Sequence, residues 1–245
     1  MDIALHPEQQ VRYDTEVAAP PAPPIPAYLE QVYWWAYVNP RGIRIFDRPW
    51  LTNLILWGNF RRLRHAAVAA LTPPISGRTL QIACVYGDFT PELVRALAPG
   101  GRLDVVDVVP DQLSNLAAKL PAKAPVTLHQ ANSAALPFGG AAFDQAVLFF
   151  LLHEQPQHVR EATVAEAWRV LRPGGRLVVV DYHRPQWWHP LRYLFAPVLG
   201  VLEPFALDLW ITDLGKWLPR GAAPVARTDR HYYGGLYQMA VFTRE

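Results

Sequence analysis

The sequence predicts an α/β fold in which helices cover a mostly parallel sheet. From Gly77 onward, short apolar runs alternate with segments of helical periodicity. Turn residues separate them, as in Pro173-Gly174-Gly175. Two further apolar runs close the chain with no helical segment between them. Strands that alternate with helices pair in parallel through crossover connections, and a terminal hairpin adds antiparallel strands.

The first 76 residues show no strand pattern. Residues 1–27 end in a proline-rich run, Pro20 to Pro26, and predict a flexible tail. Residues 28–76 predict helices, because tryptophans and leucines give this segment apolar faces before Thr72-Pro73-Pro74 ends it. The expected organisation is therefore a tail, an N-terminal helical segment and an α/β domain over residues 77–245.

The alternating part of the chain yields a seven-stranded sheet. Its expected strands are 80–85, 102–107, 126–128, 143–152 and 177–181, followed by the hairpin 223–229 and 236–243. Its expected helices are 89–97, 111–120 and 157–171. An aromatic-rich insertion over 183–220 precedes the hairpin.

Composition excludes several classes of protein. The chain has 245 residues, 51% of them hydrophobic, which suits one domain with a sizeable core. A net charge of +2 gives no support for nucleic-acid binding. The single cysteine, Cys84, allows no intrachain disulfide. The N-terminus lacks the apolar core of a secretory signal, and the most apolar stretch, 193–210, is interrupted by prolines and acids. We therefore expect a cytoplasmic protein without a membrane-spanning helix.

Residues 80–107 have the layout of a nucleotide site. A strand ends in Tyr86-Gly87-Asp88, a helix follows, and Asp107 ends the next strand. Glycine permits a sharp turn, and the Asp107 carboxylate can accept hydrogen bonds from both ribose hydroxyls. An acidic turn with one glycine disfavours a pyrophosphate and favours a cationic sulfonium amino acid. S-adenosylmethionine is therefore the expected cofactor; NAD is the alternative, and an ordinary turn would also use Gly87 and Asp88.

Further segments strengthen this interpretation. Asn132-Ser133 follows the third strand, where an adenine contact is expected. With Phe143-Asp144 and the segment 169–175, the pattern resembles class I methyltransferases, which have a Rossmann-like fold, over residues 77–182. The expected cofactor-binding residues are Val85, Tyr86, Gly87, Asp88, Asp107, Val108, Asn132 and Ser133.

Six segments, several of them outside this general pattern, are more specific. They are Tyr33-Trp34-Trp35-Ala36-Tyr37-Val38, Leu56-Trp57-Gly58-Asn59-Phe60, Ala83-Cys84-Val85-Tyr86-Gly87-Asp88, Phe149-Phe150-Leu151-Leu152-His153-Glu154-Gln155-Pro156, Asp181-Tyr182-His183 and Leu202-Glu203-Pro204-Phe205. Together they resemble one family, the rhodoquinone biosynthesis methyltransferase-like family. The resemblance implies conversion of ubiquinone to rhodoquinone, in which S-adenosylmethionine supplies an amino group that replaces a ring methoxy group and manganese assists. The chain departs from the family at Asn132, where an acidic residue is usual.

Residues at the strand ends could carry this chemistry. His153 and Glu154 follow the fourth strand and His183 follows the fifth, at the edge that faces the ligand crevice. Quinone amination needs a polarised carbonyl and a proton acceptor. We expect Tyr86, His153 and His183 to be catalytic, and Asp88, His153 and Glu154 to bind manganese, which accepts oxygen and imidazole ligands. Structural alternatives are a hydrogen-bonded strand-end histidine and a helix cap at Glu154.

Tryptophans gather in the helical segment and at the start of the insertion. They could line a pocket for a ubiquinone-like lipophilic quinone, form a belt at a membrane surface, or pack as an aromatic core. A peripheral location on the cytoplasmic face, or its mitochondrial matrix equivalent, is the expectation. Two other functions stay open: a true methyltransferase of a quinone or another lipophilic acceptor, and a noncatalytic lipid-binding or assembly protein. Glu203 and Asp208 are expected to pair with Arg192 or Arg44, or to face solvent.

Overall fold

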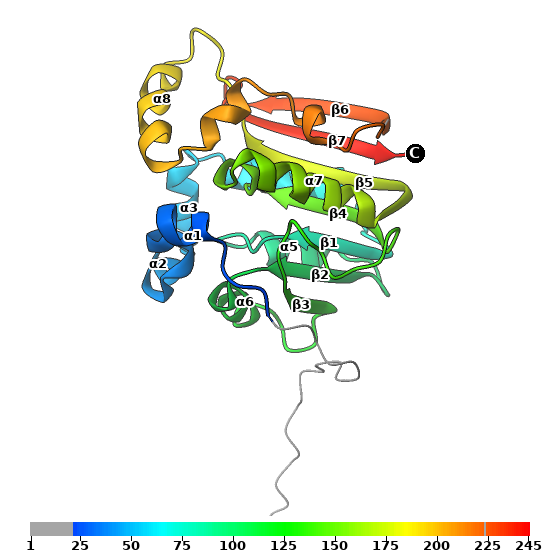
Figure 1. Ribbon diagram of the computed structural model, residues 1–245. Helices are drawn as coiled ribbons and strands as arrows, with labels where there is room; N and C mark the ends of the chain where they lie inside the picture. The colour runs from blue at the N-terminus through cyan, green and yellow to red at the C-terminus, as the bar shows by residue number, and fades with distance from the viewer. Residues whose placement is uncertain (1–21, 223) are drawn as a thin grey trace, which may run out of the picture.

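The computed structural model describes residues 22–222 and 224–245. Seven strands form one sheet in the order β3-β2-β1-β4-β5-β7-β6, and helices cover it (Figure 1). The predicted α/β class is confirmed. Most of the predicted tail, residues 1–21, lies outside the described residues.

The first five strands run parallel, as expected. They are β1 (Arg78–Ile82), β2 (Arg102–Asp107), β3 (Val126–Gln130), β4 (Phe143–Phe149) and β5 (Leu171–Tyr182). The closing strands β6 (Pro224–Tyr232) and β7 (Tyr237–Arg244) pair with each other in antiparallel fashion, and β7 also pairs antiparallel with β5. This is the expected terminal hairpin.

Several strand boundaries differ from the prediction, and two of these differences bear on the site. Strand β4 ends at Phe149, and the 3-10 turn η2 (Leu152–Glu154) follows where the strand was expected to continue. Strand β5 begins at Leu171 because its pairing with β4 includes a bulge, with residues 172–175 opposite Asp144. The glycine at 174 has a positive φ of 77°, so the predicted turn exists within the strand.

Helices account for most of the remaining chain. The N-terminal segment forms α1 (Ala27–Val32), the π-helix η1 (Trp34–Val38), α2 (Pro40–Phe46), α3 (Pro49–Ile55) and α4 (Phe60–Ala70). Helices α5 (Phe89–Ala96), α6 (Pro110–Ala117) and α7 (Gln157–Val170) connect the strands, and the insertion forms α8 (Leu191–Leu202), η3 (Ala206–Trp210) and η4 (Leu214–Trp217). Proline is the first residue of α2, α3 and α6, where its missing N–H is not needed. None of the helices in the described parts is long and apolar enough to cross a membrane.

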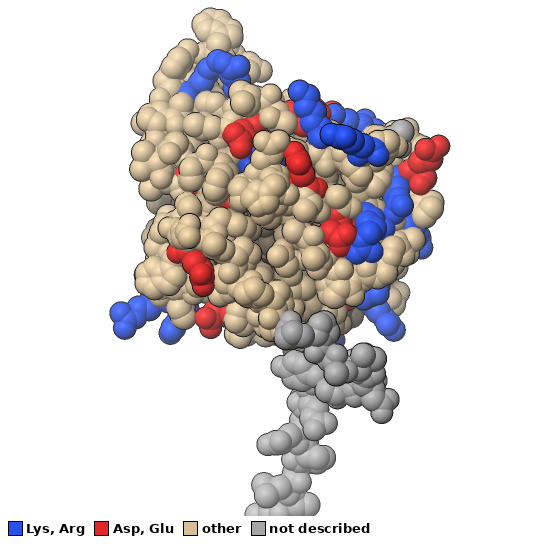
Figure 2. Space-filling view, viewed as in Figure 1, with Lys and Arg blue, Asp and Glu red and all other residues tan. Residues whose placement is uncertain are grey.

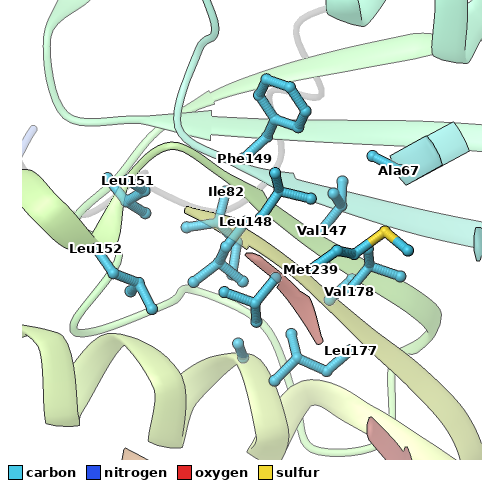
Figure 3. Packing of buried hydrophobic residues seen from close by; sticks show 14 of the residues in the cluster. Ala67, Ile82, Val147, Leu148, Phe149, Leu151, Leu152, Leu177, Val178 and Met239 are labelled. Atoms are coloured by element: carbon cyan, nitrogen blue, oxygen red, sulfur yellow. The ribbon is translucent and has the colours of Figure 1, made fainter. Parts of the chain in front are cut away.

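The core lies around the central strands. Val147, Leu148 and Phe149 of β4 pack with side chains of the neighbouring strands and are almost fully buried (Figure 3). Strands of a parallel sheet are covered on both faces, which explains the continuous apolar run in the sequence. Phe149 also stacks on Phe89 at the start of α5, with ring centroids 4.3 Å apart. This packing fixes the ends of the strands, where the site lies.

A buried arginine attaches the insertion to this core. The Arg160 guanidinium donates to the backbone carbonyls of Leu152, Gln155 and Phe205, each at 2.9 Å. It also lies 3.4 Å from Asp208. The expected pairing of Asp208 with Arg192 or Arg44 is therefore wrong, because the only arginine that reaches this carboxylate among the described residues comes from α7.

Candidate active site

Two strands end in unusual backbone conformations. Ala83, just after β1, has a φ of 73°, and Phe150, just after β4, has a φ of 55°. The left-handed region costs a residue other than glycine on the order of 1–2 kcal/mol. Such strain clusters at functional sites, where the surrounding structure enforces it. Both residues line a cleft at the carboxyl edge of the parallel strands.

This polar cleft has about 600 Å³ of empty space. Its lining contains two carboxylates, Asp107 and Glu154, and no lysine or arginine among the described residues. Such a lining suits a cationic ligand better than a phosphate. The residues that line it are Pro26, Tyr28, Leu29, Tyr37, Ala83, Cys84, Val106, Asp107, Val108, Val109, Gln112, Ala131, Asn132, Ser133, Phe150, Leu151, Glu154 and Gln155.

Asp107 is held in place by backbone donors. Its Oδ2 accepts a hydrogen bond from the amide of Cys84 at 2.7 Å, and its Oδ1 accepts one from the amide of Val109 at 2.9 Å. Burial raises the pKa of Asp107 to about 6, although these donors act in the opposite direction. A carboxylate has further lone pairs, so Asp107 can still accept from the hydroxyls of a ligand.

Gln155 and Glu154 also line the cleft, and one of their acceptor atoms lacks a donor. Gln155 donates from Nε2 to Ser133 Oγ at 3.1 Å, but its Oε1 is buried without a partner. Glu154 is buried, and burial raises the pKa of its carboxyl to about 8. Buried polar atoms are normally paired. These residues therefore fit a ligand that brings amine or ammonium donors, as S-adenosylmethionine would.

The glycine turn faces the N-terminal helices rather than the cleft. Gly87, with a φ of 78°, donates its amide to Asp47 Oδ1 at 3.0 Å, and its carbonyl accepts from Lys119 Nζ at 3.0 Å. Asp88 pairs with Arg64. Neither Val85, Gly87 nor Asp88 lines the cleft. Val85, Gly87 and Asp88 were expected among the cofactor-binding residues, but the structure places Gly87 against Asp47 and Asp88 against Arg64.

An apolar pocket adjoins the polar cleft and has about 1,320 Å³ of empty space. Tyr37 and Phe150 line both, so the two spaces meet at these rings. Tyr86 lines the apolar side, where it stacks on Tyr37 at 5.6 Å and donates its hydroxyl to the carbonyl of Ala36 at 2.5 Å. The lining comprises Trp35, Ala36, Tyr37, Phe46, Thr52, Ile55, Leu56, Trp57, Tyr86, Phe150, His153, Tyr182, Leu194, Phe195, Val198, Leu199, Leu202 and Glu203.

His153 is the base-type side chain of the apolar pocket. Its Nδ1 lies 2.9 Å from Oδ1 of Asp181, a carboxylate that also accepts from the amides of Leu152 and Tyr182. Since a carboxylate only accepts, Nδ1 carries the proton and Nε2 is left for the pocket. Burial alone would lower the pKa of His153, but the carboxylate of Asp181 outweighs it and raises this pKa to about 9. Glu203, whose Oε2 is buried and unpartnered, lines the same pocket.

His183 does not join this group. It lines a separate hollow with His231, whose ring centroid lies 4.3 Å away, and its Nδ1 donates to the carbonyl of Gly235 at 2.8 Å. The backbone amide of His183 bonds to Leu236, next to β7. The chain has thus left the crevice by this point, and the expected convergence of His153 and His183 on one pocket is wrong.

The residues expected to bind manganese do not form a ligand set. Asp88 is held by Arg64, while Nδ1 of His153 is held by Asp181. Nε2 of His153 lies 3.8 Å from Oε1 of Glu154, which leaves two groups in reach of each other. Over residues 22–222 and 224–245, no group of three His, Cys, Asp or Glu side chains could hold an ion. We therefore derive no step through manganese.

Of the predicted cofactor residues, Asp107, Val108, Asn132 and Ser133 line the polar cleft. Several lining residues were not predicted at all. Position after the central strand β4 and the turn η2 could have singled out Gln155. Asp181, near the end of β5, lines neither space but holds His153. No local pattern indicates that α1 and η1 contribute Tyr28 and Tyr37, because these residues reach the cleft from a distant part of the chain.

Comparison with known proteins now adds to the geometry. Residues 79–175 match the family described as a methyltransferase domain. The chain is thus similar to methyltransferase domains over less than half of its length, and its fold is the class I methyltransferase fold. The match covers the strands and turns that build the polar cleft, from β1 to the bulge in β5.

Proteins similar to this chain include enzymes of quinone biosynthesis. The ubiquinone/menaquinone biosynthesis C-methyltransferase UbiE of Syntrophotalea carbinolica is 35% identical over 147 residues, which are 58% of this chain and 61% of that protein. The chain thus spans less than two thirds of that relative. An uncharacterized methyltransferase of Synechocystis is 28% identical over 82% of this chain and 90% of its own length.

Solved structures share the fold. The N-methyltransferase NodS from Bradyrhizobium japonicum, solved with S-adenosyl-L-homocysteine, has a TM-score of 0.57 at 16% identity and covers 89% of this chain and 98% of its own. An S-adenosylmethionine-dependent methyltransferase from Aquifex aeolicus has a TM-score of 0.54 at 15% identity and covers 84% and 99%. At these identities the likeness concerns the fold alone.

Proposed function

We propose that this methyltransferase-domain protein is an S-adenosylmethionine-dependent transferase that modifies the ring of a lipophilic quinone. The observation that carries the proposal is the junction of two unlike spaces at Tyr37 and Phe150. One is polar and acidic, which suits a sulfonium amino acid. The other is apolar and aromatic, with one buried histidine, which suits a quinone ring and its tail.

Methyl transfer to a ring carbon is the reaction that the relatives favour. Bound S-adenosylmethionine supplies a methyl group on a positively charged sulfur. The task of the protein is to place a hydroquinone carbon next to it and to accept a proton. His153 can accept the hydroxyl proton at Nε2, and Asp181 stabilises the imidazolium that results. Loss of that proton makes the adjacent ring carbon nucleophilic. After the methyl group moves from sulfur to this carbon, the ring C–H proton passes to the oxygen and restores the aromatic ring, so one proton in total is left on His153.

Amination to rhodoquinone is the second candidate. The positions of the segments that resemble the rhodoquinone family favour this reaction. Trp35, Trp57, Tyr86, His153 and Glu203 belong to five of these segments, and all line the apolar pocket. In this reaction the quinone carbonyl must become more electrophilic, which a protonated His153 would favour by donating a hydrogen bond.

Product mass separates the two reactions. The protein would be incubated with S-adenosylmethionine and either a ubiquinone or a demethylated hydroquinone, and the quinones analysed by mass spectrometry. Methylation raises the mass, whereas replacing methoxy by amino lowers it. Nitrogen-labelled cofactor should pass its label to the ring only in the second case. If neither substrate yielded a product, the proposal would be contradicted.

Cofactor binding is tested separately. Asp107→Ala should weaken S-adenosylmethionine binding by about 1.5–3 kcal/mol, the range for lost charge-assisted hydrogen bonds. Titration calorimetry measures this directly. Asp111→Ala, an acid in the first turn of α6 that does not line the cleft, is the matched control. Equal affinity in Asp107→Ala and the wild type would remove Asp107 from the site.

The proposal includes work at a membrane surface on the cytoplasmic side, or in the mitochondrial matrix. A quinone with a long isoprenoid tail resides in the bilayer, so the enzyme must reach it there. The exposed tryptophans of the N-terminal helices and of the insertion support this part of the proposal.

A further inference from the structure

Exposed apolar side chains are concentrated in two segments. Of the sixteen large apolar side chains that are exposed in the described residues, fourteen lie in residues 34–57 and 187–202. The other two are Ile211 and Val225. Single exposed apolar residues are ordinary on a protein surface, but a gathering of this kind marks an interaction site. We call these two segments the apolar belt.

The two segments of the belt lie side by side. Trp57 and Phe195 approach with ring centroids 5.8 Å apart, which joins the end of the α3 region to α8. Six residues are both exposed and part of the pocket lining, three from each segment: Trp35, Ile55, Trp57, Leu194, Val198 and Leu202. The belt therefore forms the rim of the apolar pocket, and the pocket opens through it.

The charge of the belt is one-sided. Arg41, Arg44 and Arg48 are exposed in the first segment, whose only acidic residue, Asp47, is bound to Lys119. The second segment contains Arg192 and no acidic residue. In Figure 2 the surface over α2 and α8 is mostly tan, with blue side chains above and below it and some red ones in the region of α1 and α2. Tryptophan with flanking arginine is the composition that favours the interface of an anionic bilayer.

We infer that the apolar belt docks on a bilayer that contains anionic phospholipid, so that the pocket opens toward the acyl chains. This inference deepens the proposed function, because it supplies the route by which a quinone reaches the pocket. The tryptophans would enter the interface, and the arginines would lie at the level of the headgroup phosphates. A second copy of the chain is the alternative occupant, but an interface between two copies would place the arginines of both close together.

Vesicle flotation tests the surface without any need for activity. The full chain would be mixed with vesicles of phosphatidylcholine alone or with phosphatidylglycerol added, at low and high salt. We expect it to float with the anionic vesicles, less so in high salt, because screening weakens the attraction of the arginines. Trp50→Ser with Trp187→Ser should reduce partitioning by about tenfold, and Arg41→Glu with Arg44→Glu should remove the preference for anionic lipid.

A pair of valines provides the matched control. Val201 in the belt is 80% exposed, and Val225 on β6 is 63% exposed; neither lines the apolar pocket. Val201→Ser should weaken vesicle binding, whereas Val225→Ser should not. The inference would be overturned if both valine variants and the double tryptophan variant bound vesicles as well as the wild type does. It would also be overturned if the wild type did not float with any vesicles. A dimer in light scattering that Trp50→Ser dissociates would assign the belt to a second copy.

Turnover of a tail-less quinone in solution separates this inference from the proposed function. If the protein docked on vesicles but showed no turnover, the docking inference would hold and the quinone reaction would be contradicted. If it showed turnover but no docking, the reaction would hold and the docking inference would be contradicted. The belt variants should turn over the tail-less quinone at the wild-type rate, since Trp50 and Trp187 do not line the pocket.

Discussion

Nδ1 of His153 lies 2.9 Å from Oδ1 of Asp181, and the Asp181 side chain has no solvent exposure. This contact fixes which nitrogen of the ring is available to the substrate. We expect His153→Asn to reduce turnover by about 10²- to 10⁴-fold, the usual contribution of general acid–base catalysis. Cofactor affinity should stay within about twofold, because His153 lines the apolar pocket and not the polar cleft. Steady-state rates and titration calorimetry measure the two effects, and His158→Asn, an exposed histidine of α7, is the control.

The pH profile of turnover should identify the role of His153, whose pKa is raised to about 9. As a base it must be neutral, so the rate should rise with pH and level off above about 9. As an acid it must be protonated, so the rate should fall above about 9. The first profile is expected for methyl transfer to a hydroquinone and the second for amination of a quinone. His153→Asn should flatten whichever limb is observed; a limb that persists in this variant belongs to another group.

Cofactor binding should release a proton near neutral pH. Glu154 has a pKa of about 8 and is mostly protonated at pH 7, whereas a bound cation favours its charged form and lowers that pKa. Affinity should therefore rise with pH and reach a plateau above about pH 8. Calorimetry in buffers of different ionisation enthalpy counts the released protons. Glu154→Gln should bind without release below pH 8; undiminished release would place the titrating group elsewhere.

Chelation should leave cofactor affinity unchanged, because the polar cleft has no three side chains that converge as metal ligands among the described residues. Turnover is the second readout. Methyl transfer from a sulfonium needs no ion, whereas the resemblance to the rhodoquinone family predicts that manganese restores amination after chelation. A loss of cofactor affinity in chelator, reversed by manganese, would show that an ion belongs to the cofactor site.

Arg160→Met should destabilise the protein by about 3–5 kcal/mol, a large effect for one residue. The substitution leaves the carbonyls of Leu152, Gln155 and Phe205 without their donor and removes the guanidinium from the Trp217 ring, now 4.7 Å away. Urea denaturation measures the change in the free energy of unfolding. Arg169→Met on the same helix loses a partly exposed ion pair with Glu166 and hydrogen bonds to the carbonyls of Phe138 and Leu136, and should cost less because water can reach these groups more easily.

Periodicity and turn residues predicted the sheet well, because buried parallel strands are continuous apolar runs. They could not predict contacts between distant polar groups. Asp47 binds the amide of Gly87, 40 positions further along the chain, and thereby turns it away from the cofactor cleft. Asp88 was expected at the cofactor because it lies in the turn after β1. It pairs with Arg64 instead, and Arg64 comes from a helix whose position no local pattern predicts. The sequence allowed His153 to be predicted at the site because it follows a central strand. His183 lies away from the site because its amide bonds to Leu236, next to β7.

The junction at Tyr37 and Phe150 has a kinetic consequence. Under the proposed function, one reactant would come from water and the other from lipid, and neither would have to pass through the space that holds the other. Such a layout permits random order of binding, and it lets the hydrophilic by-product return to water while the modified ring diffuses back into the lipid. The enzyme would then act as a phase-transfer catalyst, in which two aromatic side chains separate the space supplied from water from the space supplied from lipid.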